Sequence, residues 1–276
     1  MLHISWPIVA AILSAIGLTP GNAHASPVMD PVSQIQISIA FNNLPYAPNC
    51  RLGWGFSCFI QGLEKHILFD TGSNGDILLY NMRTMHLRAE EIDLIVLSHA
   101  HFDHTGGLAS VLNINPGVTI CAPQDMAVSL RRQLSPPTTV LGAPEPIQLC
   151  AQGMTTGSMG RGLQEQALII DLPSGLVIIT GCAHPGVTNI VCRAKEISNR
   201  PVYLLIGGFH LMGHSQKQVV EIADELTSMG VQYVAPSHCT GDEAVEYFKQ
   251  RWGERFVHSG CGAHIVINEQ TITVKE

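Results

Sequence analysis

The chain has 276 residues, of which 46% are hydrophobic and 13% are charged, and its formal net charge is -7 at pH 7. This composition is typical of a folded globular protein and excludes an intrinsically disordered chain. A nucleic-acid-binding surface needs clustered Lys and Arg, and the sequence has no basic run, so we expect no nucleic-acid partner.

The N-terminus has the layout of a secretory signal peptide. An apolar stretch over Ile8–Leu18 is followed by Pro20 and Gly21, and then by small residues up to Ala25. The stretch is too short to span a bilayer comfortably. We therefore expect residues 1–25 to be a signal peptide and the mature protein to be exported, periplasmic or secreted, with no stable membrane association. An apolar extension that packs on the domain is the alternative.

Short apolar runs of strand length follow, separated by turns rich in Gly, Pro and Asn. We expect strands at 34–41, 55–60, 65–70, 93–98, 118–123, 166–172, 175–182, 202–208 and from residue 231, and a closing hairpin from residue 263. Helices are expected at 107–114, 124–134, 186–198, 215–230 and 242–253. In the clearest of these, Ser215 can cap the start and Gly230 ends the pattern. Residues 135–165 predict a loop with an edge hairpin that is suited to cover a site.

The order of these elements is a β-rich half with helices, followed by a second β-rich half with helices. It predicts an α/β fold in which two sheets pack face to face and helices cover their outer sides. No linker separates the halves, so we expect a single domain over residues 26–276.

Eight cysteines are spread irregularly along the chain, which excludes a disulfide scaffold. An exported chain can still pair some of them, and Cys50 and Cys58 are the first candidates for a disulfide. We expect most of the others to be small buried side chains.

Four metal-binding side chains are concentrated in the segment "LSHAHFDHTGG", residues 97–107. His99, His101, Asp103 and His104 directly follow the apolar run "IDLIVL". Alternate residues of an extended segment point the same way, so His99 and His101 can reach one ion. A bend after them turns Asp103 and His104 toward a second point. Imidazole suits divalent ions such as zinc, and a carboxylate offsets their charge.

Three later histidines also follow apolar β-runs. His184 lies in "VIITGCAHPG", His210 in "LLIGGFHL" and His238 in "VAPSHCTG". If the ends of these strands meet at one edge of the fold, the histidines supply the ligands that a single run cannot provide. The alternative for each is an ordinary core or surface histidine.

The motifs "DTGS", "LSHAHFDHTGGL" and "PSHC" resemble those of the metallo-β-lactamase superfamily. More narrowly, "GCAHPGVTNI", "GGFHL" and "SHCTG" are similar to the dihydropterin ribofuranosyl-aminobenzene phosphate synthase-like branch. The resemblance covers the chain from about Gln34 to its end. It implies the four-layer αββα sandwich of the metallo-β-lactamase fold, with one or two divalent metal ions at one edge. Zinc is the default ion, and manganese and iron are the alternatives.

The resemblance also implies roles for individual residues. It assigns His99 and His101 to a first ion, and Asp103, His104 and His238 to a second. Asp70 in "FDTGS" is expected to hydrogen-bond near the site and fix its loop geometry.

The chain departs from the superfamily pattern in the segment "TGCAH". Cys182 stands where most members have an aspartate that bridges both ions. No histidine lies between His104 and His184, so we infer that His184 is the third ligand of the first ion. Cys182 is either a thiolate ligand or merely a small residue at the turn.

We expect a metal-dependent hydrolase that uses a metal-activated water on a small-molecule ester, lactone or phosphodiester. Asp103 would orient the water, and His210 would donate a proton or a hydrogen bond to the leaving group. The alternatives are a dihydropterin ribofuranosyl-aminobenzene phosphate synthase-like enzyme and a non-catalytic metal-binding module.

Overall fold

The structure, a computed structural model, describes residues 34–276. The expected signal peptide, residues 1–25, lies outside the described residues. The described residues belong to one compact unit. Within the described part, none of the helices combines the length and the hydropathy that a membrane span requires.

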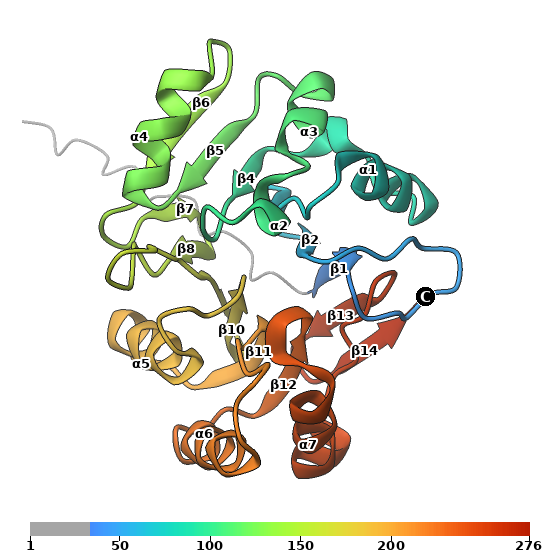
Figure 1. Cartoon of the computed structure of the whole chain (residues 1–276), viewed down its shortest axis with the longest axis vertical. Helices are drawn as coiled ribbons and strands as arrows, with labels where there is room; N and C mark the ends of the chain where they lie inside the picture. The colour runs from blue at the N-terminus through green and yellow to red at the C-terminus, as the bar shows by residue number, and fades with distance from the viewer. Residues whose placement is uncertain (1–33) are drawn as a thin grey trace, which may run out of the picture. The chain divides into compact units, whose positions relative to one another are not determined.

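The first sheet has eight strands, in the order β14-β13-β1-β2-β3-β4-β5-β6 (Figure 1). Neighbouring strands run antiparallel from β14 to β3 and parallel from β3 to β6. The strands are β1 (Gln34–Asn42), β2 (Phe56–Gln61), β3 (Ile67–Phe69), β4 (Leu94–Val96), β5 (Thr119–Ala122), β6 (Thr139–Gly142), β13 (His264–Asn268) and β14 (Ile272–Lys275).

The second sheet has six strands, in the order β12-β11-β10-β9-β8-β7. Its parallel part is β10 to β12, and the remaining neighbours are antiparallel. The strands are β7 (Gln148–Cys150), β8 (Gly153–Thr155), β9 (Leu168–Leu172), β10 (Gly175–Thr180), β11 (Val202–Gly208) and β12 (Tyr233–Ser237).

Three apolar layers hold the two sheets and their helices together. The central layer lies between the sheets and includes Ile37 of β1 and Ile179 of β10. The outer layer of the first sheet packs α1 (Gly75–Thr84), α3 (Leu108–Ile114) and α4 (Gln124–Gln133) against it. The outer layer of the second sheet packs α5 (Val187–Ser198), α6 (Gln216–Ser228) and α7 (Asp242–Trp252). The predicted αββα sandwich is therefore confirmed (Figure 1).

The apolar periodicity of the sequence predicts the positions of most helices correctly. Ser215 caps α6 as expected, and Gln218 completes a reciprocal capping box with it. The patterns miss α1, which begins after Asn74, whose side chain accepts hydrogen bonds from the backbone of Asp76 and Ile77. Its buried face includes Gly75 and Asn81, so the apolar periodicity that marks a helix is hidden.

The expected pairing of Cys50 with Cys58 is wrong. Cys58 belongs to β2 and faces the central layer between the sheets, whereas Cys50 packs on the outer layer of the same sheet. Because the two side chains lie on opposite faces, they cannot approach each other. Both thiols are free, and Cys50 lies beside Cys261 instead.

Candidate metal centre

The site lies where strands of both sheets end. Asp70 follows β3, His99 follows β4 closely, and His238 follows β12 directly. Cys182 and His210 come two residues after the ends of β10 and β11. Since β10, β11 and β12 are parallel to one another, their carboxyl ends meet at one edge, and β3 and β4 of the other sheet bring their own ends to the same place.

The buried half of the site consists of Asp103, His104, Cys182 and His238, whose ligand atoms all lie within 4.8 Å of one another. His104 Nε2 is 3.3 Å from His238 Nε2 and 3.2 Å from the Cys182 sulfur. Asp103 Oδ2 is 3.2 Å from His238 Nε2 and 3.6 Å from His104 Nε2. The expected ligands of the second ion thus converge, and Cys182 joins them.

Hydrogen bonds fix which ring nitrogens carry protons in this group. His104 Nδ1 donates to Asp70 Oδ2 at 2.6 Å, and His238 Nδ1 donates to Asn43 Oδ1 at 2.9 Å. With both rings neutral, each Nε2 therefore presents a lone pair, and the two lone pairs face each other beside the Asp103 carboxylate. A metal ion between the rings would satisfy both lone pairs, and the added sulfur of Cys182 suits a thiophilic ion.

The more open half of the site consists of His99, His101 and His184, again with ligand atoms within 4.8 Å of one another. His99 Nδ1 donates to Ser98 Oγ at 2.8 Å, which leaves the Nε2 lone pair directed at His101 Nδ1, 3.1 Å away. His184 Nε2 is buried and has no hydrogen-bond partner. An unsatisfied buried nitrogen among imidazoles fits a metal ligand. These are the three residues expected to hold the first ion.

Asp70 connects both halves. Its Oδ1 accepts a hydrogen bond from the backbone N–H of Ser98, and its Oδ2 accepts one from Ser98 Oγ, both at 2.7 Å. Ser98 Oγ accepts from His99, and Asp70 Oδ2 accepts from His104, so one carboxylate orients an imidazole of each group. Orientation of metal-binding histidines by carboxylates is common in metal sites. The role expected for Asp70 fits this geometry.

Burial and the crowding of imidazoles keep several ligands unprotonated. Burial, together with neighbouring histidines, lowers the pKa of His99 strongly and that of His184 to about 4. For Asp103, burial alone would raise the pKa, but the hydrogen bond with His238 and the nearby imidazoles lower it to about 2. Neutral imidazoles and an ionised carboxylate are the forms that bind metal ions.

A third set of side chains, Cys182, His210 and Cys239, borders the buried half. A hydrogen bond from the Cys182 thiol lowers the pKa of Cys239, and a hydrogen bond to Cys239 raises the pKa of His210. The His210 ring also lies against His184, with the ring centroids 4.3 Å apart. His210 is exposed, so it faces the approach to both groups from the solvent.

Sequence reasoning misses Glu165, which lies just before β9. Its buried carboxylate accepts hydrogen bonds from the backbone N–H groups of Cys182, Ala183 and His184, at 2.9, 2.8 and 2.7 Å. Burial raises its pKa, and these three hydrogen bonds oppose that rise. The only signal in the sequence is a single acidic residue directly before the apolar run "QALIIDL".

Backbone strain is concentrated at the same place. Asp70, Ala183, His210 and His238 all adopt positive φ, between 52° and 63°. Non-glycine residues in this region cluster at functional sites, where the surrounding structure holds them. Here the left-handed conformation turns the chain sharply soon after β3, β10, β11 and β12, next to the metal-binding groups.

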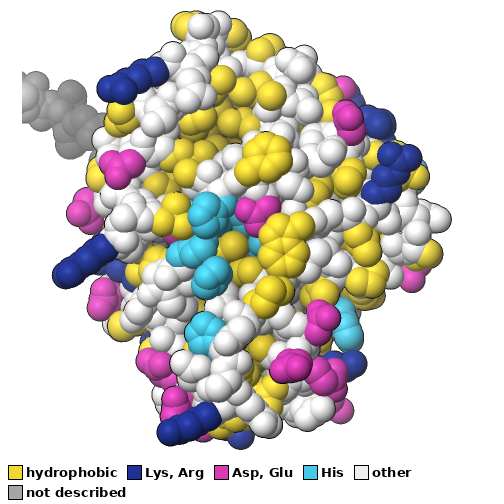
Figure 2. Space-filling model, in the orientation of Figure 1, with side chains coloured by type: hydrophobic (Ala, Val, Ile, Leu, Met, Phe, Trp, Pro, Cys, Tyr) yellow, Lys and Arg dark blue, Asp and Glu magenta, His cyan; other side chains and the backbone are white. Residues whose placement is uncertain are grey.

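Cavities lie on two sides of the metal-binding groups. One of about 1040 Å³ includes His238 in its lining, and one of about 500 Å³ includes His184 and Arg161. Histidine side chains gather in the middle of this face beside hydrophobic ones, whereas Lys and Arg lie at its margins (Figure 2). Phe102 and Trp54 are large aromatic side chains near the groups that stay exposed, by 71% and 48%.

Comparison with known proteins agrees with this geometry. The sequence model of the metallo-beta-lactamase superfamily matches residues 55–238, which span the strand ends from β2 to β12. The chain belongs to the metallo-β-lactamase superfamily. A superfamily protein described as a metal-dependent hydrolase has a crystal structure that aligns with a TM-score of 0.69 and 24% identity, covering 85% of this chain and 98% of that one. Human tRNase Z, short form, aligns with a TM-score of 0.57 and 14% identity, covering 86% of this chain and 100% of that one.

Curated superfamily relatives also match by sequence. A protein of Methanocaldococcus jannaschii named as 7,8-dihydropterin-6-methyl-4-(beta-D-ribofuranosyl)-aminobenzene-5'-phosphate synthase is 32% identical over 266 residues, covering 79% of this chain and 90% of its own. An Aeropyrum pernix protein named as a metal-dependent hydrolase is 29% identical over 187 residues, covering 60% of this chain and 75% of its own. The resemblance to the synthase branch noted in the sequence is therefore confirmed.

Proposed function

We propose that this chain is a metal-dependent hydrolase that acts on an ester, lactone or phosphodiester of a small molecule. The observation that carries the proposal is the contact between the Nε2 atoms of His104 and His238, 3.3 Å apart, with both Nδ1 atoms already used as donors. This pair is arranged to bind a cation, and three further imidazoles lie next to it.

The two groups supply enough ligands for two divalent ions, and we propose zinc for both. His99, His101 and His184 would hold one ion, and a second would be held by Asp103, His104, Cys182 and His238. Such ions lower the pKa of a bound water to roughly 7 and polarise the oxygen of the scissile group. Three histidines form an open site of the catalytic type, whereas four ligands close a site.

Two side chains have roles of their own in the proposed reaction. Asp103 stays ionised because its pKa is about 2, and as the one carboxylate of the buried group it is suited to accept a hydrogen bond from the attacking water. His210 is exposed next to His184, and its hydrogen bond with Cys239 raises the pKa of its ring. It is therefore suited to donate a proton to the leaving group.

A synthase-like activity is the second candidate. It is supported by the 32% identity to the M. jannaschii synthase, whose name includes a phosphate group. Arg161 lines the cavity beside His184 and is the one Arg or Lys in its lining, so it is a candidate to bind a phosphate there. An exported location, which we propose from the N-terminal sequence, argues against this activity because such substrates are cytoplasmic.

Metal reconstitution with a substrate panel tests the hydrolase. Protein purified without added metal is analysed for its metal content, depleted with a chelator and then supplied with zinc, manganese or iron. Hydrolysis of ester, lactone and phosphodiester substrates is measured with each ion. We expect zinc to restore turnover, and His101→Ala to lower kcat/KM by at least about a hundredfold because it removes a ligand.

The matched control is His86→Asn, which removes an exposed imidazole that belongs to neither group. Asparagine tolerates the left-handed backbone of this position. Turnover equal in His101→Ala and His86→Asn, or no turnover with any ion, would contradict the proposal. Conversion of a pterin precursor without hydrolysis of any panel member would favour the synthase.

A further inference from the structure

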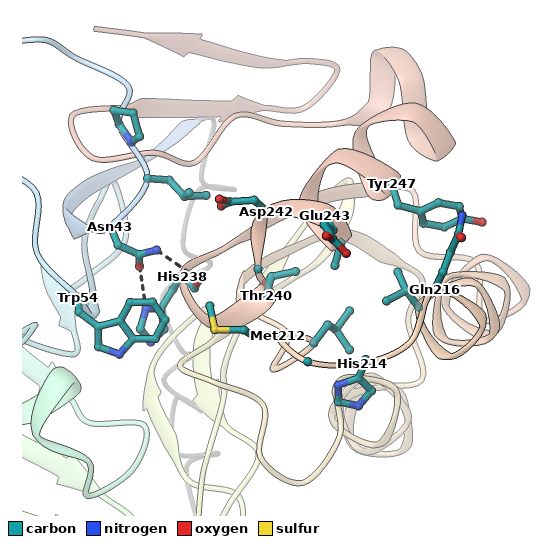
Figure 3. Close-up of a pocket in the computed structure, with 17 residues that line it drawn as sticks. Asn43, Trp54, Met212, His214, Gln216, His238, Thr240, Asp242, Glu243 and Tyr247 are labelled. Atoms are coloured by element: carbon teal, nitrogen blue, oxygen red, sulfur yellow. Dashed lines mark hydrogen bonds between the residues drawn. The ribbon is translucent and has the colours of Figure 1, made fainter.

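The larger cavity next to the metal-binding groups has a distinct chemical character. It begins at His238 and Trp54 and extends to Gln216 and Tyr247 on the far side, as Figure 3 shows. Because His238 belongs to one metal-binding group and also lines the cavity, a substrate bound at that group has this space beside it. The cavity is thus placed to hold the part of the substrate that does not react.

Carboxylates dominate the charge of this cavity. Asp242 and Glu243, in the first turn of α7, both line it, and no Lys or Arg does so. Neither carboxylate forms an ion pair with any side chain of residues 34–276. Figure 3 places both between the Trp54 side and the Tyr247 side of the cavity. A phosphate or carboxylate group of a ligand would face two negative charges here, which the N-terminal end of α7 offsets only in part and which no Lys or Arg of the lining offsets.

The walls of the cavity are apolar and aromatic. Trp54 is 48% exposed and Met212 is 57% exposed, although both are large apolar side chains. The Trp54 ring lies 4.8 Å from the His238 ring, measured between centroids, so its position is tied to the metal-binding group. An exposed indole face next to a reaction site is suited to stack on a flat ring.

We propose that this cavity selects substrates whose non-reacting part is an aromatic ring with N–H donors or a positive charge, and that it discriminates against anionic rings. The ring would stack on Trp54, and its N–H groups would donate to Asp242 and Glu243. The inference rests on the proposed function, because it names the substrate class of the same site.

Binding of a matched pair of probes tests the inference without turnover. Benzamidine and benzoate have nearly the same shape, but one carries a positive amidinium with N–H donors and the other a carboxylate. Their affinities for the zinc-loaded protein are measured by isothermal titration calorimetry. We expect Asp242→Asn and Glu243→Gln each to weaken benzamidine binding by about tenfold, and to leave benzoate binding unchanged or stronger.

Glu246→Gln is the matched control, because Glu246 lies one turn later on α7 and lines a neighbouring cavity only. It should change neither affinity by more than about twofold. Acidic residues in a first turn also stabilise a helix, so the melting temperature of each variant is recorded. If one variant fails to fold, Trp54→Leu provides the second test, with an expected loss of affinity for both probes.

Benzamidine affinity within twofold of the unmodified protein in both carboxylate variants would overturn the inference. Equal weakening of benzamidine and benzoate binding in the Asp242 and Glu243 variants would also overturn it, since that result indicates a general loss of structure. Because the assay measures binding alone, a protein that hydrolyses nothing can still show the predicted selectivity. Failure of the hydrolase proposal is thereby distinguished from failure of this one.

Discussion

Single hydrogen bonds on the histidine rings decide how this site presents its ligands. Asp70 accepts from His104 Nδ1 and from both donors of Ser98, whose Oγ in turn accepts from His99 Nδ1. The Nδ1 proton of each ring therefore lies on the side away from the metal-binding position. The Asp70 side chain is fully buried, and among residues 34–276 the hydrogen-bond partners of its carboxylate are Ser98 and His104. Its charge therefore serves the orientation of imidazoles in both groups.

Replacement of Asp70 by asparagine tests this orientation. Asparagine keeps the shape but turns one acceptor into a donor, which faces His104 or Ser98 unfavourably. We expect the affinity for the ion held by His104 to fall by about ten- to a hundredfold. Competition with a chelator of known affinity measures the change, and Asp76→Asn, at an exposed position of α1, is the control. Unchanged zinc affinity in Asp70→Asn would show that the hydrogen bonds do not orient the ligands.

The lowered pKa of His184 predicts a pH dependence of stability. Its pKa is about 4 in the folded chain, mainly because of burial and then of nearby His210 and His101, against roughly 6.5 in an unfolded chain. Between these values the unfolded chain binds more protons at this residue, so the free energy of unfolding falls as the pH falls through this window. Above about pH 6.5 the contribution is constant.

Denaturant unfolding of the metal-free protein at a series of pH values measures this effect. The control is His184→Gln, which lacks the titrating ring while the other ionisable groups remain. We expect the unmodified protein to lose more stability than the variant between about pH 6.5 and about pH 4. Parallel profiles for the two proteins would mean that His184 is not held in its neutral form.

At the scale of elements, the loop after β10 depends on a residue from the segment before β9. Glu165 satisfies the N–H groups of three consecutive residues, and so fixes the turn that carries Cys182 and His184 into different metal-binding groups. A buried carboxylate with three backbone donors leaves few alternatives for the loop. The spacing of the two groups therefore depends on this interaction between elements.

Glu165→Gln should loosen this loop. The amide has one oxygen in place of two, and its NH2 group would face backbone donors, so we expect a loss of about 2 to 4 kcal/mol in the free energy of unfolding. Zinc binding should weaken as well, since His184 loses its support. Chemical denaturation and zinc titration measure the two effects. Glu145→Gln, which changes an exposed acid in the loop between β6 and β7, is the control.

Some residues of this site can be predicted from the sequence, because short local patterns mark them. The motif His-x-His-x-Asp-His after an apolar run indicates a metal-binding segment without any tertiary information. The apolar runs before His184 and His238 indicate that these residues follow strands. Glu165 and Asn43 act only through tertiary contacts, so no local pattern marks them. Helix α1 is missed for a related reason, because its buried face carries Asn81, whose partners lie on β1 and in a loop.

At the scale of the whole molecule, each metal-binding group draws ligands from both sheets. His99 and His101 follow β4 of the eight-stranded sheet, whereas His184 follows β10 of the six-stranded one. The buried group is likewise divided, with Asp103 and His104 on one side and Cys182 and His238 on the other. An ion can thus reach its full set of ligands only when the two sheets are packed together.

Metal removal should therefore destabilise the packing of the two halves. A ligand that binds only the folded state adds about 2.7 kcal/mol at a free concentration one hundred times its Kd. For a chain of this size that corresponds to a rise of roughly 5 to 10 °C in melting temperature. Calorimetry of the zinc-loaded protein and of the chelator-treated protein measures the shift. His238→Ala should reduce it, because the variant loses a ligand of the buried group, whereas His86→Asn should retain it in full; a shift of the same size in both variants would mean that zinc stabilises the chain somewhere else.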